Sequence, residues 1–512
     1  MPGGASFSLR ILFCAGSGVV TGLAFQPFNL WGLLFVGVAG LTLALGGSGR
    51  LRSAPLLGLA YGLGLTGTTL NWMSAIFIEA MVALVITVAL FYAALAVAVK
   101  ISLRARCWPL LAAGCWTAVE ALLCRWPFDG FGWVRAGYAM IDSPLAGGLP
   151  LIGVAGVGFV SVLCGQWLAW LVLQLRQNGL GWARLAKSAL GVAALVAVCL
   201  AGYAVPPSAA ADAVAVGWVQ GGAPGGGVYG LGVVRTITKN QLAETRALIA
   251  EVESGAQPSP EFIVWPENGS DLDPFADAQT MTLLQESLAA ADRPVLFGII
   301  SSGPGPEERQ TAALWWAPGQ EPGPRYAKRG IVPFGEWVPY RDLLLPLIPK
   351  LSYVGAQSVP GDEPGVMSVS TATGRQLKLG VLICYDITFD SYVYDLVRGG
   401  AELIAVQSSN AMYQGTGQIE QQFAMTRARA AELRREILVT TTSGISGFIG
   451  PGGEVVQRIP DSQPAHGIVT MPLRTGETPV VFLAPVVELV VALGSLLGVL
   501  VVGWTTRRKC EE

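Results

Sequence analysis

Residues 377–386 read Leu-Lys-Leu-Gly-Val-Leu-Ile-Cys-Tyr-Asp, and this stretch decides the fold of the part of the chain that carries it. The run from Leu377 to Ile383 is apolar enough to be a buried β-strand, and the residues from Thr388 onward favour a helix. Cys384 lies at the junction of the two. Nucleophiles and ligands of α/β sheets lie at the carboxyl ends of strands, so we expect the Cys384 thiol at the edge of a sheet.

Short apolar runs alternate with longer amphipathic segments on both sides of this stretch, from residue 206 to 476, which is typical of an α/β domain. We expect strands at 213–219, 261–265, 294–300, 311–316, 377–383, 402–407, 437–442, 446–450 and 466–471. The expected helices are 235–253, 278–291, 388–398 and 418–435.

The rest of the chain is much more apolar. The 512 residues are 52% hydrophobic and only 13% charged, with a formal net charge of −2. This composition is typical of a membrane protein and argues against a nucleic-acid partner. Apolar stretches of spanning length lie at 9–25, 30–48, 55–73, 78–100, 107–124, 150–174, 186–205 and 480–503. The sequence therefore predicts an N-terminal membrane domain of about seven spans (1–205), an α/β domain (206–476), and a C-terminal span with its tail (477–512).

The positions of the cations predict the orientation of these eight spans. Every second span is followed by basic residues, namely Arg50 and Arg52, then Lys100, Arg104 and Arg106, then Arg176, Arg184 and Lys187, then Arg507, Arg508 and Lys509. Short cytoplasmic loops are enriched in Lys and Arg. Both termini are therefore expected in the cytoplasm and the α/β domain outside it, with Arg125 and Arg135 as exceptions.

Cys384 is the one cysteine of the α/β domain, because the others lie in or beside the predicted spans. It is either a buried structural thiol or a nucleophile. A nucleophile needs a neighbouring base or cation, since a free thiol has a pKa of about 8.5. The single histidine, His466, lies in a late strand, so a Cys-His pair is disfavoured and the base is expected to be a carboxylate or a lysine.

Two charged residues follow other predicted strands. Glu267 comes after Phe262–Trp265 and Pro266, and Lys328 comes after Tyr326 and Ala327. Judged by its local sequence alone, each would be a charged loop residue that faces solvent. If the strands share one sheet, however, their ends bring Glu267, Lys328 and Cys384 to one cleft.

These motifs carry a family resemblance. Trp-Pro-Glu at 265–267, Tyr-x-Lys at 326–328 followed by Val-Pro-Phe-Gly-Glu at 332–336, and Ile-Cys-Tyr-Asp at 383–386 resemble, in this order, the nitrilase superfamily. With the flanking spans, the chain is similar over essentially its whole length to the membrane branch of that superfamily, the apolipoprotein N-acyltransferases. The resemblance implies an α-helical membrane bundle joined to an αββα sandwich with a Glu-Lys-Cys triad.

The resemblance also implies roles for individual residues. Glu267 would be the general base, Cys384 the nucleophile, and Lys328 the cation that stabilises thiolate and oxyanion. The residues expected to orient or bind substrate are Glu336, Tyr385 and Asn410. Asp386 stands where the family usually has glutamate, which puts the role of that carboxylate in doubt.

Two connectors suggest contact with lipid. In the outer connector 125–135, Arg135 is a candidate ligand for a lipid phosphate, while the aromatic residues there also fit an interfacial belt. The apolar loop Leu343–Pro349 is either a lipid-contacting lid or a loop buried on the sheet.

By resemblance, the acyl donor is phosphatidylethanolamine or a related phospholipid, and the acceptor is the α-amine of diacylglyceryl-cysteine in an apolipoprotein. The acyl group would pass through a thioester on Cys384, with no metal or organic cofactor. The implied location is the bacterial plasma membrane, as a multi-pass protein with an extracytoplasmic catalytic domain.

Two other classes remain open. A membrane-anchored amidase would use the same triad with water in place of the amine, although eight spans exceed what an anchor requires. A transporter with a binding domain would need several charges inside the membrane, and Glu120 is the one clear case.

Overall fold

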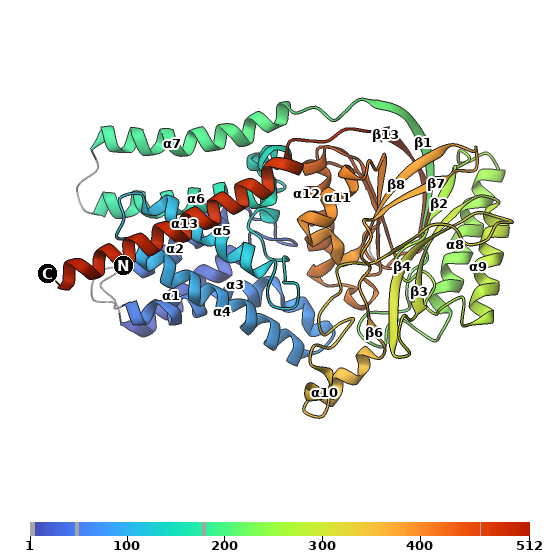
Figure 1. Ribbon diagram of the computed structural model, residues 1–512, viewed down its shortest axis with the longest axis horizontal. Helices are drawn as coiled ribbons and strands as arrows, with labels where there is room; N and C mark the ends of the chain where they lie inside the picture. Colours follow the sequence, from blue (N-terminus) through green and yellow to red (C-terminus); the bar gives the residue numbers. More distant parts are fainter. Residues whose placement is uncertain (1–5, 47–50, 177–180, 461, 512) are drawn as a thin grey trace. The chain divides into compact units, whose positions relative to one another are not determined.

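The computed structural model describes residues 6–46, 51–176, 181–460 and 462–511. The chain divides into two compact units, one formed by Met1–Pro206 with Thr478–Glu512 and the other by Pro207–Glu477. The first is helical and the second contains all the described strands (Figure 1).

A helix occupies each of the eight apolar stretches of the first unit. These helices are α1 (Phe7–Gly22), α2 (Leu33–Gly46), α3 (Ala54–Thr69), α4 (Ile78–Ser102), α5 (Trp108–Leu123), α6 (Leu149–Arg176), α7 (Trp182–Ala201) and α13 (Val480–Glu511). Among the described residues, four segments are long and apolar enough to cross a membrane, namely Ile78–Ser102, Pro144–Arg176, Trp182–Ala204 and Val480–Thr506. The prediction of eight spans is therefore confirmed for these four only. The helices α1, α2, α3 and α5 have 14 to 16 residues, about 24 Å or less at ~1.5 Å per residue, against a hydrocarbon core of ~30 Å.

Two cations meet at the end of α2. Arg10 of α1 donates from Nη2 to the carbonyl oxygen of Ala44 at 2.7 Å, and Lys100 of α4 donates from Nζ to that of Leu45 at 2.5 Å. The last carbonyls of a helix have no partner within the helix, so they accept from cations readily. The start of α1 and the ends of α2 and α4 therefore lie together at one end of the helical unit.

The second unit contains two sheets. The strands of the seven-stranded sheet follow the order β13-β1-β2-β3-β4-β5, with β6 paired to β4, and those of the six-stranded sheet follow β12-β11-β10-β9-β8-β7. The strands of the first sheet are β1 (Ala210–Gln220), β2 (Phe262–Val264), β3 (Val295–Ser302), β4 (Glu308–Trp316), β5 (Arg325–Ala327), β6 (Gln357–Ser358) and β13 (Ala465–Arg474). Those of the second are β7 (Val366–Ser370), β8 (Gln376–Ile383), β9 (Leu403–Ser408), β10 (Ile437–Thr441), β11 (Gly447–Ile449) and β12 (Val455–Arg458).

The sheets face each other across a hydrophobic core, and helices cover their outer faces. Alternate residues of β8, from Leu377 through Leu379 and Val381 to Ile383, point into this core, as the period of two in a strand requires. The helices α8 (Thr236–Glu253) and α9 (Ala278–Ala291) pack on the seven-stranded sheet. The helices α11 (Asp390–Arg398) and α12 (Gly417–Leu433) lie on the other side, which gives the layer order αββα (Figure 1).

The predicted strands and helices of this unit all form, within a few residues of the expected bounds. The short strands β6, β7 and β12 and the single-turn helix α10 (Arg341–Leu344) were not predicted, and β5 was expected only as the strand end before Lys328. The prediction that the three site strands share one sheet is wrong, since β2 and β5 belong to the seven-stranded sheet and β8 to the six-stranded one.

Candidate active site

Cys384 begins a sharp turn at the end of β8. The strand stops at Ile383, and residues Cys384–Thr388 form a single 3₁₀ turn before α11. Cys384 has a left-handed backbone, with φ of 51°, which costs a non-glycine residue on the order of 1–2 kcal/mol. The surrounding contacts must hold this conformation, and strain of this kind clusters at active sites. The thiol itself is half-buried.

Asp386 supplies part of that support. Its Oδ2 accepts hydrogen bonds from the Ile383 N–H at 2.9 Å and the Tyr326 hydroxyl at 2.9 Å, and its Oδ1 accepts from the Gly330 N–H at 2.6 Å. The carboxyl group is fully buried, and this burial raises its pKa to about 6. It therefore ties the end of β8, from one sheet, to β5 and the loop after Lys328, from the other.

Lys328 joins two carboxylates. Its Nζ lies 3.0 Å from Glu267 Oε1 and 2.8 Å from Glu336 Oε1. Lys328 is 2% exposed and Glu267 is 3% exposed. The interpretation of Lys328 and Glu267 as loop charges that face solvent is therefore wrong. The second sheet buries the loops that carry them, and the local sequence around each residue does not indicate that sheet.

Each member of this cluster is held by backbone as well as by charge. The second oxygen of Glu267 accepts from the Ser409 N–H at 2.9 Å, just after β9, and that of Glu336 accepts from the Val332 N–H at 2.8 Å. The main chain of Lys328 continues the pairing of β5, since its N–H donates to the carbonyl oxygen of Thr311 at 2.9 Å. The role of Ser409 could not be predicted from the sequence, because its contribution is a backbone N–H, which every residue except proline has.

The electrostatics of the site follow from this arrangement. Burial opposes the charge of Lys328, but Glu267 and Glu336 together raise the pKa of its ammonium well above the usual range. Burial also raises the pKa of the Cys384 thiol well above its usual value, the negative charges of Glu267 and Glu336 raise it further, and the positive charge of Lys328 lowers it. The resting site therefore holds a charged lysine and a protonated thiol, and a base must remove the thiol proton for Cys384 to react.

The other residues predicted in the α/β unit are sequence neighbours of the site residues, since Tyr385 follows Cys384 and Asn410 follows Ser409. Tyr385 is buried, with its ring perpendicular to that of Phe389 at 5.4 Å. Asn410 has a left-handed backbone with φ of 52°. Its Nδ2 donates to Gln418 at 2.9 Å and to Gln422 at 2.6 Å. Asn410 thus binds side chains of α12, and direct contact with substrate stays a prediction for both residues.

Arg135 belongs to the helical unit, where its side chain is buried and Nη2 lies 3.5 Å from Glu488 Oε1. Its role as a phosphate ligand stays a prediction. His466 lies on β13, with Nδ1 2.6 Å from Glu244 and Nε2 3.4 Å from Glu251, both of α8. Within the described part of the chain, no group of three or more histidine, cysteine or carboxylate side chains could hold a metal ion.

Two family models match the chain. Residues 17–167 match the apolipoprotein N-acyltransferase N-terminal domain, and residues 231–478 match the carbon-nitrogen hydrolase family. Solved structures of an amidase from Nesterenkonia, of the nitrilase superfamily, are also similar, as in one with 17% identity and a TM-score of 0.37 that covers 52% of this chain and 92% of that one.

Curated relatives extend the match over nearly the whole chain. The apolipoprotein N-acyltransferase of Mycolicibacterium smegmatis is 30% identical over 505 residues, covering 95% of this chain and 84% of that protein. The enzyme of the same name from Photobacterium profundum is 27% identical, covering 92% and 91% of the two chains. That of Pseudomonas aeruginosa is 29% identical, covering 88% of each. These relatives cover 88–95% of the chain, across both the apolar helices and the α/β unit that carries Glu267, Lys328 and Cys384. The chain therefore belongs to the apolipoprotein N-acyltransferase family.

Proposed function

We propose that this chain moves an acyl group from a phospholipid such as phosphatidylethanolamine to the N-terminal amine of diacylglyceryl-cysteine in an apolipoprotein, through a thioester on Cys384. The observation that carries the proposal is the binding of Lys328 by Glu267 and Glu336, together with the hydrogen bonds by which Asp386 ties the strained turn of Cys384 to the loop after Lys328. The proposed membrane arrangement has eight spans, with the α/β unit outside the cytoplasm.

The first step forms the thioester. Glu267 takes the proton from Sγ of Cys384, and the sulfur attacks the carbonyl carbon of the phospholipid ester. The S–C bond forms, the ester C–O bond breaks, and the departing lysophospholipid oxygen takes the proton back from Glu267. Lys328 stabilises negative charge on the sulfur and on the carbonyl oxygen, and it is effective because a buried ammonium acts through a low dielectric.

The second step discharges the thioester. The acceptor amine attacks the thioester carbonyl, Glu267 takes a proton from the nitrogen, the N–C bond forms and the C–S bond breaks. Cys384 leaves as a thiolate and regains its proton from Glu267. Glu336 keeps Lys328 in place through both steps, since it holds the ammonium at 2.8 Å.

Intact-mass analysis of the purified chain tests the first step. Incubation with phospholipid alone should add one acyl mass to Cys384, and neutral hydroxylamine should remove it. Cys384→Ala should stay unlabelled although its other cysteines remain. Cys384→Ser is an informative control, because a hydroxyl group is a much weaker nucleophile when its proton is harder to remove.

A diacylglyceryl-cysteinyl peptide tests the second step. Its addition should discharge the thioester and give N-acyl peptide in an amount that matches the thioester lost. Acyl transfer by Cys384→Ala at the parent rate would contradict the mechanism. Discharge by water as fast as by the peptide would instead favour an amidase that uses the same residues.

A further inference from the structure

Arg429 of α12 is fully buried and binds the end of the turn that Cys384 begins. Its Nε donates to the carbonyl oxygen of Ile387 at 2.9 Å, and its Nη2 donates to that of Thr388 at 3.3 Å. Ile387 and Thr388 are the last two residues of this turn. The final carbonyls of a single helical turn have no partner within it, so the guanidinium supplies donors that the turn itself cannot.

The turn is therefore fixed at both ends. Asp386 binds the Ile383 N–H where the turn begins, and Arg429 binds two carbonyls where it ends. Cys384 lies between these two anchors with its left-handed backbone. A non-glycine residue relaxes from this conformation to a right-handed or extended one unless the surrounding structure holds it.

Two carboxylates neutralise the guanidinium. Nη1 lies 2.6 Å from Glu432 Oε2, one turn along α12, and Nη2 lies 2.7 Å from Asp390 Oδ1, at the start of α11. The side chains of Arg429 and Glu432 are both 0% exposed. A buried ion pair adds little net stability, because desolvation offsets the attraction. What arginine adds here is a planar set of five N–H donors, which binds two carbonyls and two carboxylates at once.

We propose that Arg429 is a positioning residue of the reaction, which holds the carbonyl oxygens of Ile387 and Thr388 and so keeps Cys384 in the conformation from which its sulfur attacks. This inference rests on the proposed function, because it takes Cys384 as the nucleophile. Arg429 acts on the turn and is buried, so it should affect the rate of the chemical steps and not the affinity for the phospholipid.

Arg429→Lys tests this role, because a lysine keeps a cation for Glu432 and Asp390 but lacks the planar fork that reaches both carbonyls. The full chain in detergent, given phospholipid and the diacylglyceryl-cysteinyl peptide, should lose about tenfold or more in kcat and keep KM for the phospholipid within about twofold. The double variant Arg429→Met with Glu432→Met removes the buried cation together with its buried anion. It should show the same change and serves if the lysine variant does not fold.

Hydrogen exchange followed by mass spectrometry reports on the turn without lipid or peptide. In Arg429→Lys, the amides of residues 383–389 should exchange about tenfold faster than in the parent, because the turn opens locally. Exchange in β9, residues 403–408, should stay unchanged. This comparison separates release of the turn from a general loss of stability.

The matched control is Arg435→Lys. Arg435 is also buried and also donates to main-chain carbonyls, those of Ala401 at 2.6 Å and Gly476 at 2.7 Å, which lie outside the turn. This control should keep kcat, and exchange at residues 383–389, within about twofold of the parent.

A parent-like kcat in either folded Arg429 variant overturns the inference. An equal loss of kcat in Arg435→Lys also overturns it, since Arg429 would then be one of several arginines that only stabilise the fold. If the turn exchanges faster in the Arg429 variants but the parent forms no N-acyl peptide, Arg429 keeps its role in holding the turn and the proposed function fails.

Discussion

Lys328 holds the buried carboxylate of Glu267 and the half-buried carboxylate of Glu336 with one ammonium, so its loss should affect both activity and stability. We predict that Lys328→Met abolishes N-acyl peptide formation and lowers the free energy of unfolding by about 3 kcal/mol, because Glu267 would remain buried without its partner. Turnover and thermal unfolding in detergent measure the two effects. The double variant Lys328→Met with Glu267→Gln neutralises one of the two carboxylates that have lost their partner. It should recover part of the free energy of unfolding but none of the turnover. Normal turnover in Lys328→Met would remove Lys328 from the mechanism.

Asp386 should make stability depend on pH. Burial raises its pKa from 3.8 to about 6, so the folded chain binds this proton more tightly than the unfolded chain does. The contribution of protonated Asp386 to the free energy of unfolding is complete below about pH 4 and is lost as the pH rises through about 6. The free energy of unfolding changes by on the order of 3 kcal/mol over this range. Asp386→Asn should show a smaller difference in unfolding between pH 4.5 and 7.5 than the parent, whereas Asp395→Asn on α11, whose carboxylate is partly exposed, should match the parent. If the free energy of unfolding changed by the same amount between pH 4.5 and 7.5 in the parent and in Asp386→Asn, Asp386 would not be the source of the pH dependence.

At the scale of single elements, the strand and turn around Cys384 could be predicted because their signals are local. The apolar run 377–383 ends where β8 ends. The Trp-Pro-Glu motif follows β2, and Lys328 of the Tyr-x-Lys motif is the first residue after β5. The assignment of β2 and β5 to one sheet and β8 to another could not be derived from local patterns, since it depends on pairing between distant strands. The two-sheet sandwich was expected from the family resemblance alone.

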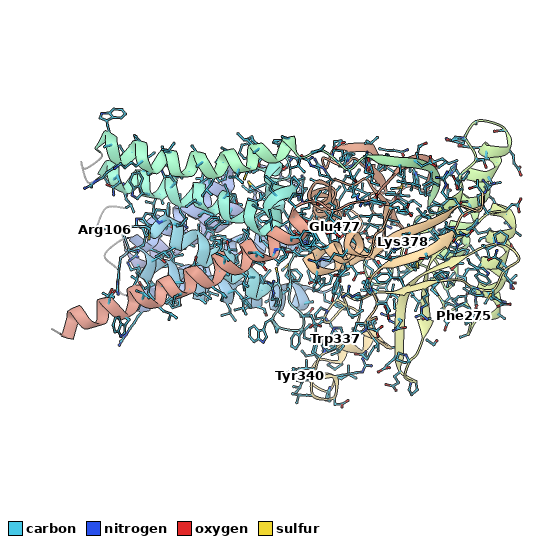
Figure 2. All side chains as sticks on the ribbon, turned by 45° about the horizontal axis from the view of Figure 1, so that its top comes forward. Arg106, Phe275, Trp337, Tyr340, Lys378 and Glu477 are labelled. Carbon is cyan, nitrogen blue, oxygen red and sulfur yellow. The ribbon has the colours of Figure 1, made fainter. Side chains whose placement is uncertain are left out.

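The segment around α10 was predicted to be either a lid or a buried loop, and it is exposed. Leu343 and Leu347 are 66% and 71% exposed, and Trp337 and Tyr340 lie at the start of the same segment (Figure 2). Its far end contacts another loop, because the Tyr353 hydroxyl lies 3.0 Å from that of Tyr229. An exposed apolar segment of this kind is typical of a surface that meets lipid.

Removing two of these apolar side chains should therefore impair use of the lipid and spare the thiol. We predict that Leu343→Ser with Leu347→Ser lowers kcat/KM for a long-chain phospholipid severalfold and leaves alkylation of Cys384 by iodoacetamide unchanged. Val456→Ser, which removes an exposed apolar side chain of β12, is the control and should leave both unchanged. A parent-like kcat/KM in the double variant would exclude lipid contact by this segment.

At the scale of the whole molecule, the proposed activity requires a defined orientation in the membrane. Lys100, from a cation group predicted to be cytoplasmic, and Arg10, near the N-terminus predicted to be cytoplasmic, both bind the end of α2. The structure therefore brings together cations that the positive-inside pattern assigns to one side. A phosphatase reporter, active only outside the cytoplasm, should be inactive when fused after Leu51 or after Lys187. It should be active when inserted near Ser254, at the end of α8. The proposed function requires Cys384 and the acceptor amine to lie on the outer side of the membrane. An inactive reporter at Ser254, in a chain that is inserted and stable, would place Cys384 in the cytoplasm and contradict the acyltransferase proposal, even if the thiol is reactive.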